Sequence, residues 1–317
     1  MIFGNDVSRY QNNPTVNNGK IDFKKMKAAG SKFVYIRLGV GFNKDVYYEI
    51  NKAGAKEAGL PWGFYYVPWP VSNTGALLKA YESMVGGDWG DIPPAIDVET
   101  AGLGLGLFIE WVNFTEKRWL AQITNNYSVS IATISDVRKK LVFYTRATHF
   151  DTYTNLKGLK EQLGLRTSLW IAHYTYSPLK LPRMPKNSWS NYLIHQYSAD
   201  ENRLGFEYGV ASLQIDMDFF NGDEKLFLNW VGATSLPTPN EDEIPSSNKV
   251  MIQNAYQLWG RTKPVLEPNT ERYILRSGEI YEKTGDPIYD AKAKVWYQPL
   301  RIPEQIVYAS NKYMREI

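Results

Sequence analysis

The sequence predicts an α/β protein whose mostly parallel sheet closes into a barrel, or nearly so, followed by a small all-β domain. Strand-length apolar runs alternate with helix-length amphipathic segments through residues 1–231, which is typical of a parallel sheet covered by helices. Residues 232–248 then hold three prolines, small polar residues and an acidic run, a composition that predicts a linker. Residues 249–317 contain short strand-like runs and turns without a long helical pattern.

The first elements already suggest which side of the sheet faces inward. We expect a strand at residues 2–7, a short helix at 21–29 and a second strand at 32–39. The second strand carries aliphatic residues on one face and Arg37 on the other, because successive strand side chains point to opposite faces. If the aliphatic face packs on helices, Arg37 points inward and needs an acidic partner. We expect that partner to be Asp6, with a purely structural arginine as the alternative.

The same alternation continues along the chain. Amphipathic periodicity predicts helices at residues 45–58, 74–85 and 108–124. Further strands are predicted at 61–67, 93–99, 141–145, 168–174, 191–198 and 213–219.

Acidic residues lie at the ends of three of these strands. Asp97 and Glu99 share one face of strand 93–99, Asp6 lies near the end of the first strand, and Asp216 lies in the last one. Since barrel enzymes carry their chemistry at one end of the strands, we expect these carboxyl groups to converge. Neighbouring carboxylates raise one another's pKa, and a carboxyl group that keeps its proton can act as the general acid of glycoside cleavage.

Composition excludes several other functions. The formal net charge of +3 is too small to indicate nucleic-acid binding, and the absence of cysteine excludes disulfides and thiol chemistry. His149, His173 and His195 are widely spaced, so we expect no metal site and no cofactor. No apolar run is long enough for a membrane helix, so membrane insertion is not expected. The 10 tryptophans and 22 tyrosines suit sugar stacking as well as core packing.

The first residues lack the basic segment and apolar core of a signal peptide. If the protein acts outside the cell that makes it, we expect something other than its own leader to deliver it. The sequence does not determine the oligomeric state, and a monomer is the default expectation.

Seven stretches, in this order along residues 1 to about 225, carry a family resemblance. The ordered set resembles the glycoside hydrolase family 25 muramidases, the lysozymes typical of phages and bacteria. The stretches are Asp6-Val7-Ser8-Arg9-Tyr10-Gln11, Lys32-Phe33-Val34-Tyr35-Ile36-Arg37, Ala58-Gly59-Leu60-Pro61-Trp62-Gly63-Phe64-Tyr65-Tyr66, Asp97-Val98-Glu99, Leu169-Trp170-Ile171-Ala172-His173-Tyr174, Gln196-Tyr197-Ser198 and Ile215-Asp216-Met217-Asp218-Phe219-Phe220-Asn221-Gly222.

The resemblance implies an irregular, flattened β/α (TIM-like) barrel that hydrolyses the β-1,4 bond between N-acetylmuramic acid and N-acetylglucosamine in bacterial peptidoglycan. It assigns the acid to Glu99 and companion carboxylates to Asp97, Asp6 and Asp216. Two positions depart from the family pattern: Asp218 replaces a frequent asparagine, and His195 replaces a usual tryptophan. Residues near the predicted strand ends are candidates for the sugar groove, with core packing as the alternative for each aromatic residue. These candidates are Arg37, Tyr65, Tyr66, Trp69, Trp170, Tyr174 and Tyr197.

Residues 249–317 resemble, more faintly, bacterial Src-homology-3-like wall-binding domains, through Leu275-Arg276-Ser277-Gly278, Trp296-Tyr297 and residues 307–313. This two-part organisation, with the missing leader, predicts a phage endolysin that is made in the host cytoplasm and acts on the bacterial cell wall after release. A bacterial autolysin exported by another route is the alternative. Two other functions stay open from the sequence. One is a non-catalytic wall-binding protein. The other is a chitinase-type glycosidase, although such enzymes carry a further aspartate where this chain has Ala95.

Overall fold

The computed structural model describes residues 1–15, 17–103, 105–127, 130–153, 160–199, 204–212 and 214–233, together with the strands of residues 249–316. The chain divides into two compact units, Met1–Leu236 and Pro237–Ile317. Among the helices of this described part, none is long and apolar enough to cross a membrane.

The first unit is built on a closed barrel of eight strands. Neighbouring strands follow the order β1-β2-β4-β5-β6-β7-β8-β9, and β9 pairs with β1 to close the ring. The hairpin strand β3 (Asn43–Lys44) pairs only with the end of β2. The barrel strands are β1 (Ile2–Val7), β2 (Ser31–Val40), β4 (Trp62–Val67), β5 (Ala95–Asp97), β6 (Leu141–Thr145), β7 (Thr167–Ala172), β8 (Ile194–Ser198) and β9 (Asp216–Phe220).

One strand runs against the others. Strands β1, β2 and β4 to β8 pair in parallel around the ring, whereas β9 is antiparallel to both β8 and β1. The α/β barrel predicted from the sequence is thus confirmed, with one reversed strand. Because β9 is reversed, Asp216 is the first residue of its strand. The prediction that this strand ends in an acid is therefore wrong.

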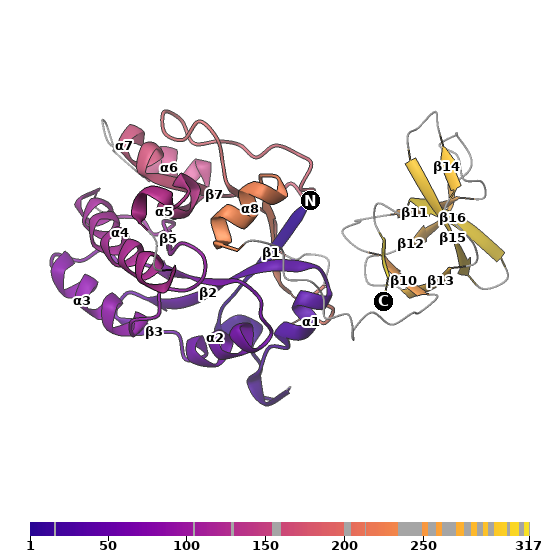
Figure 1. Cartoon of the computed structure of the whole chain (residues 1–317), viewed down its shortest axis with the longest axis horizontal. Coiled ribbons are helices and arrows are strands. Elements are labelled where there is room, and N and C mark those ends of the chain that lie inside the picture. Colours follow the sequence, from indigo (N-terminus) through magenta and orange to yellow (C-terminus); the bar gives the residue numbers. More distant parts are fainter. Residues whose placement is uncertain are drawn as a thin grey trace. The chain divides into compact units, whose positions relative to one another are not determined.

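Helices surround the barrel (Figure 1). Several begin at a side chain that accepts a hydrogen bond from the first turn, as Asp22 does for α1, Asn73 for α3 and Asp223 for α8. The helices are α1 (Phe23–Ala28), α2 (Tyr48–Glu57), α3 (Thr74–Val85), α4 (Leu105–Tyr127), α5 (Asp136–Lys139), α6 (Ala147–Tyr153), α7 (Lys160–Arg166) and α8 (Glu224–Val231); short 3₁₀ helices cover Arg9–Gln11, Asn17–Gly19 and Ile131–Thr133.

Apolar side chains form one core outside the strands and another inside the ring. On β2 the predicted alternation is confirmed, since Val34 and Ile36 pack outward and Phe33 and Tyr35 pack inward. The inner core fills the barrel below its carboxyl end. At Gly4 the ring of Phe33 lies so close that an added Cβ would be 2.4 Å from its Cζ atom. The space beside Gly4 is therefore taken by an aromatic ring.

The second unit contains short strands that pair into an eight-stranded sheet. Its order is β12-β11-β16-β15-β13-β10-β17, with β14 paired to β15. The predicted linker at 232–248 falls almost wholly outside the described residues, and the resemblance to wall-binding domains stays a prediction. The strands are β10 (Lys249–Ile252), β11 (Leu258–Arg261), β12 (Glu271–Leu275), β13 (Ile280–Lys283), β14 (Ile288–Asp290), β15 (Val295–Ile302), β16 (Gln305–Ser310) and β17 (Met314–Glu316).

Candidate active site

A cavity of about 160 Å³ lies at the end of the barrel where the parallel strands terminate. Its walls come from seven of the eight barrel strands or from the residues that directly follow them. The lining residues are Asp6, Tyr65, Asp97, Glu99, Tyr144, Arg146, Trp170, Tyr174, Gln196 and Asp216.

The four carboxylates singled out in the sequence meet at this cavity. Asp6 lies one residue before the end of β1, and Asp97 is the last residue of β5, with Glu99 two positions further. Asp216 is the first residue of β9 and pairs directly with Asp6 across the antiparallel ladder. The reversed strand thus brings its amino end to the rim that the other strands reach with their carboxyl ends.

A hydrogen-bonded chain holds the most buried of these acids. Tyr144 donates its hydroxyl to Oε1 of Gln196 at 2.8 Å, and Nε2 of Gln196 donates to Oδ2 of Asp6 at 2.7 Å. Burial raises the pKa of Asp6 well above its usual range. The charges of Asp216 and Asp218 raise this pKa further, whereas the bond from Gln196 lowers it.

Asp97 and Glu99 differ in their environment. Burial raises the pKa of Asp97 well above its usual range, and the charge of Glu99 adds to the effect. Burial also raises the pKa of Glu99, against the lowering effect of Arg146. We expected the like charges of Asp97 and Asp6 to raise the Glu99 pKa; instead the main cause is burial, and the like-charge effect falls on Asp97.

Arg146 is the cation of the site. Its Nε atom lies 2.6 Å from Oε1 of Glu99, and its Nη2 atom donates to the hydroxyl of Tyr174 at 3.0 Å. The side chain of Glu99 is 30% exposed and that of Arg146 is 47% exposed. Glu99 therefore lies where a ligand from solvent can reach it.

The two residues that depart from the family pattern are both buried. Asp218 lies inside the barrel, where Nε1 of Trp170 donates to its Oδ1 at 2.8 Å. Burial raises its pKa well above the usual range, and the charge of Asp216 adds to this. His195 packs outside the barrel with its Nε2 atom 2.8 Å from the carbonyl oxygen of His173, so its ring is not a wall of the cavity.

The aromatic candidates on the strands point either into the cavity or into the outer core, depending on the strand face on which each lies. Tyr65, Trp170 and Tyr174 line the cavity. The predictions for Tyr66 and Tyr197 are wrong in position, because both side chains pack into the core outside the barrel.

Trp69 is 54% exposed and lies against Gly41, and it is not among the residues that line the cavity. A role for Trp69 in holding substrate stays a prediction.

The prediction that Arg37 pairs with Asp6 is also wrong. Arg37 pairs with Asp45, with its Nη2 atom 2.7 Å and its Nε atom 2.8 Å from Oδ2 of that residue. Asp45 follows the β2–β3 hairpin, which brings it back over the end of β2. The backbone amide of Arg9 donates to the same carboxylate at 3.1 Å. The ion pair thus fixes the hairpin and the turn after β1, and it lies outside the lining of the cavity.

Three lining residues were not singled out from the sequence, namely Tyr144, Arg146 and Gln196. Strand parity contains the signal for two of them, because Val142 points into the inner core, which places Tyr144 and Arg146 on the same side. Gln196 alternates with His195 and Tyr197, which face outward.

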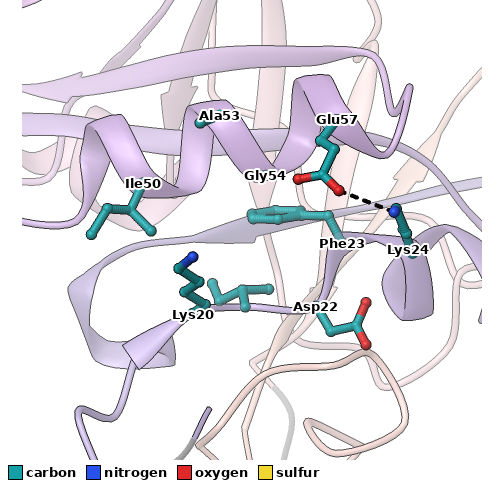
Figure 2. A pocket seen from close by; sticks show the side chains of 9 residues that line it. Lys20, Asp22, Phe23, Lys24, Ile50, Ala53, Gly54 and Glu57 are labelled. Atoms are coloured by element: carbon teal, nitrogen blue, oxygen red, sulfur yellow. Dashed lines mark ion pairs between the residues drawn. The ribbon is translucent and has the colours of Figure 1, made fainter. Parts of the chain in front are cut away.

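A second cavity, of about 350 Å³, lies between α1 and α2 (Figure 2). Its two acidic lining residues are already engaged: Glu57 pairs with Lys24 at 3.0 Å, and Asp22 caps α1 by accepting from the amide of Lys25 at 2.9 Å. The cavity between α1 and α2 thus holds two carboxylates, whereas four meet at the end of the barrel.

The barrel cavity combines acids whose pKa values are raised, one half-exposed arginine and aromatic walls. Carboxyl groups that hold their protons can donate them to a leaving oxygen, and neighbouring carboxylates can stabilise a developing positive charge. Among the described residues, no group of three or more histidine, cysteine, aspartate or glutamate side chains is placed to hold a metal ion.

Comparisons with known proteins agree with this chemistry. Lysozyme M1 of Streptomyces globisporus is 27% identical over 246 residues, which cover 74% of this chain and 72% of the relative. A bacterial lysozyme from Streptomyces coelicolor has a similar fold, with a TM-score of 0.52 and 24% identity over 74% of this chain and 98% of its own. A muramidase from Acremonium alcalophilum gives a TM-score of 0.51 and 25% identity, over 73% of this chain and all of its own. The family described as glycosyl hydrolases family 25 matches residues 5–206, more than half of the chain, and this protein belongs to that family.

Proposed function

We propose that the protein is an N-acetylmuramidase that cleaves the β-1,4 bond between N-acetylmuramic acid and N-acetylglucosamine in bacterial peptidoglycan, with Glu99 as the general acid. The observation that carries the proposal is the meeting of four carboxylates at one cavity, of which Glu99 is within reach of solvent. Membership of a glycoside hydrolase family and similarity to proteins named lysozyme and muramidase support the substrate.

In the proposed mechanism Glu99 gives its proton to the glycosidic oxygen as the bond to the muramic acid sugar breaks. Burial raises the pKa of Glu99, which favours the protonated form that an acid catalyst needs. Asp97, at the end of the same strand, stabilises the positive charge that develops on the sugar ring or orients its 2-acetamido group. Asp6 and Asp216 lie across the cavity and complete its negative field.

Two routes complete the reaction, namely direct attack by water and attack by the substrate's own acetamido oxygen. The stereochemistry of the new reducing end distinguishes them: direct attack by water inverts the anomeric centre, whereas a two-step route through the acetamido group retains it.

The test compares Glu99→Gln with Glu116→Gln on defined peptidoglycan, with mass spectrometry of the released fragments. Glu116 is a matched control, because it is 33% exposed and pairs with Arg166 at 2.9 Å, as Glu99 is 30% exposed and pairs with Arg146. Loss of general acid catalysis should lower the rate about 10²–10⁴-fold for Glu99→Gln and leave Glu116→Gln active. Full activity of Glu99→Gln would refute the assignment, and new glucosamine ends in place of muramic acid ends would instead favour a chitinase-type specificity.

We also propose that the protein acts as an endolysin, made in a host cytoplasm and released to the wall, with the second unit gripping wall components. The division into two compact units supports this arrangement. Expression inside bacteria should leave the culture intact until the membrane is permeabilised, and lysis without permeabilisation would contradict the role. Wall retention of the Glu99→Gln chain should fall when the chain ends at Leu236; unchanged retention would show that the second unit does not bind the wall.

A further inference from the structure

Arg146 lies beside the proposed acid and contacts it directly. It follows β6 by one residue and reaches Glu99, which follows β5, so that the two side chains meet above neighbouring parallel strands. The contact joins Nε of Arg146 to Oε1 of Glu99 at 2.6 Å. An ion pair of this length stabilises the carboxylate form of the glutamate and so opposes burial, which favours the protonated form that a general acid needs.

A second contact holds Arg146 independently of Glu99. Its Nη2 atom donates to the hydroxyl of Tyr174, and its guanidinium carbon lies 5.1 Å from the centre of the Tyr174 ring. A cation over an aromatic face is attracted to it. Since the arginine side chain is 47% exposed, it can leave the carboxylate and remain attached to the tyrosine at the wall of the cavity.

We propose that Arg146 is a positioning residue that holds Glu99 in the free enzyme, and that a saccharide entering the cavity displaces it from the carboxyl group while its contact with Tyr174 remains. This inference rests on the proposed role of Glu99 as the acid. The sugar takes the place of the guanidinium beside Oε1, and Glu99, whose side chain is 30% exposed, takes up a proton from solvent water as the complex forms. Binding of the glycan thus sets the protonation state of the acid.

The groups that face Glu99 determine the direction in which its pKa changes when Arg146 is removed. Asp97 comes from the same strand, Tyr144 and Arg146 from β6 and the residues after it, and Tyr174 from the segment after β7. Asp6 and Asp216 complete the opposite wall of the cavity, and His149 on α6 lies close enough for Arg146 to affect its pKa.

Arg146 is the group that lowers the Glu99 pKa, against the effect of burial. Removal of Arg146 therefore raises this pKa in the empty enzyme. In the complex, where the arginine has already moved, the change is smaller.

The experiment measures pH profiles of kcat/KM and of kcat on a soluble glycan oligomer prepared from peptidoglycan. The first profile reports ionisations of the free enzyme and the second those of the complex. In Arg146→Gln the alkaline limb of kcat/KM should move up by about 1 pH unit, the lower end of the range for an opposite charge, because the pair is partly exposed. The alkaline limb of kcat should move by less than half as much.

Arg166→Gln is the matched control, because Arg166 pairs with Glu116 at 2.9 Å, is 37% exposed and directly precedes β7. In this variant the alkaline limbs of kcat and of kcat/KM should both stay at the pH of the parent. If Arg146→Gln does not fold, Arg146→Lys replaces it: a lysine keeps the charge, and the kcat/KM limb should shift by a smaller amount in the same direction. Equal shifts in kcat and kcat/KM would overturn displacement, and no shift in either would reduce Arg146 to a structural contact.

Failure of this inference is distinguishable from failure of the proposed function. If Glu99→Gln is inactive and the alkaline limb of kcat/KM does not move in Arg146→Gln, only the proposed role of Arg146 is refuted. A fully active Glu99→Gln refutes the acid assignment itself.

Discussion

Replacing Asp218 with asparagine should change how stability depends on pH. Asp218 is fully buried inside the barrel, and its Oδ1 accepts a hydrogen bond from Trp170 at 2.8 Å. The amide of asparagine keeps the acceptor oxygen for Trp170 and has nearly the same size. The substitution therefore removes an ionisable group without opening a cavity.

The sign follows from the direction of the pKa shift. Burial raises the Asp218 pKa in the folded protein, so the folded state holds this proton more tightly than the unfolded chain does. The associated stability is fully present below the unfolded pKa of about 4 and is lost as pH rises toward the folded pKa. For one proton the loss is at most about 1.4 kcal/mol per pH unit, or about 2.7 kcal/mol between pH 5 and 7. The Asp218→Asn variant has no ionisable group at this position, so it does not lose this stability as pH rises.

Urea unfolding of the full chain at pH 5, 6 and 7, followed by tryptophan fluorescence, measures the difference. The advantage of Asp218→Asn over the parent should grow with pH across this range. Asp136→Asn serves as the control, because its side chain is 91% exposed and it removes the same formal charge. Parallel curves for the parent and Asp218→Asn would show that the aspartate keeps no extra proton in the folded state, and would refute the reasoning.

Three further substitutions test the packing around the site. Gly4→Ala forces a methyl group into the ring of Phe33 at 2.4 Å and should destabilise the barrel by about 1–3 kcal/mol in urea unfolding; an unchanged midpoint would contradict the close approach. Asp45→Ala leaves Arg37 largely buried without its partner, so thermal unfolding should show a loss of about 3 kcal/mol, and a loss below 1 kcal/mol would mean that water replaces the pair. Gln196→Leu leaves two buried oxygens without partners and should cost about 1–3 kcal/mol, whereas wild-type stability would show that the hydrogen-bonded chain contributes little.

The alternation of side chains was enough to predict much of the barrel. Strands 2–7 and 141–145 and helix 74–85 have the predicted bounds. The inward direction of Asp97 and Glu99 followed from the same parity. Helices α5 to α8 were not predicted; they have only four to eight residues each, so few turns are available to show a helical period.

The errors at the site have a common physical origin. Tyr66 and Tyr197 were chosen because they lie near strand ends, but parity places Tyr66 beside the outward residue Phe64. The partner of Arg37 depends on the path of a hairpin that returns Asp45 to the strand end, and a two-residue strand gives almost no pattern to predict. The pairing of Arg146 with Glu99 joins two separate loops, which no local period encodes.

The reversed strand β9 affects when the enzyme can complete its fold during synthesis. Asp6 emerges early in synthesis, yet its partner across the ladder is Asp216, and the ring cannot close until Phe220 has left the ribosome. Contacts this distant in sequence form late and slow the search for the native state. A nascent chain that stops before this strand contains three of the four acids but lacks Asp216 and the β9 side of the cavity. The chain therefore gains hydrolytic activity only after β9 has been made and the ring has closed.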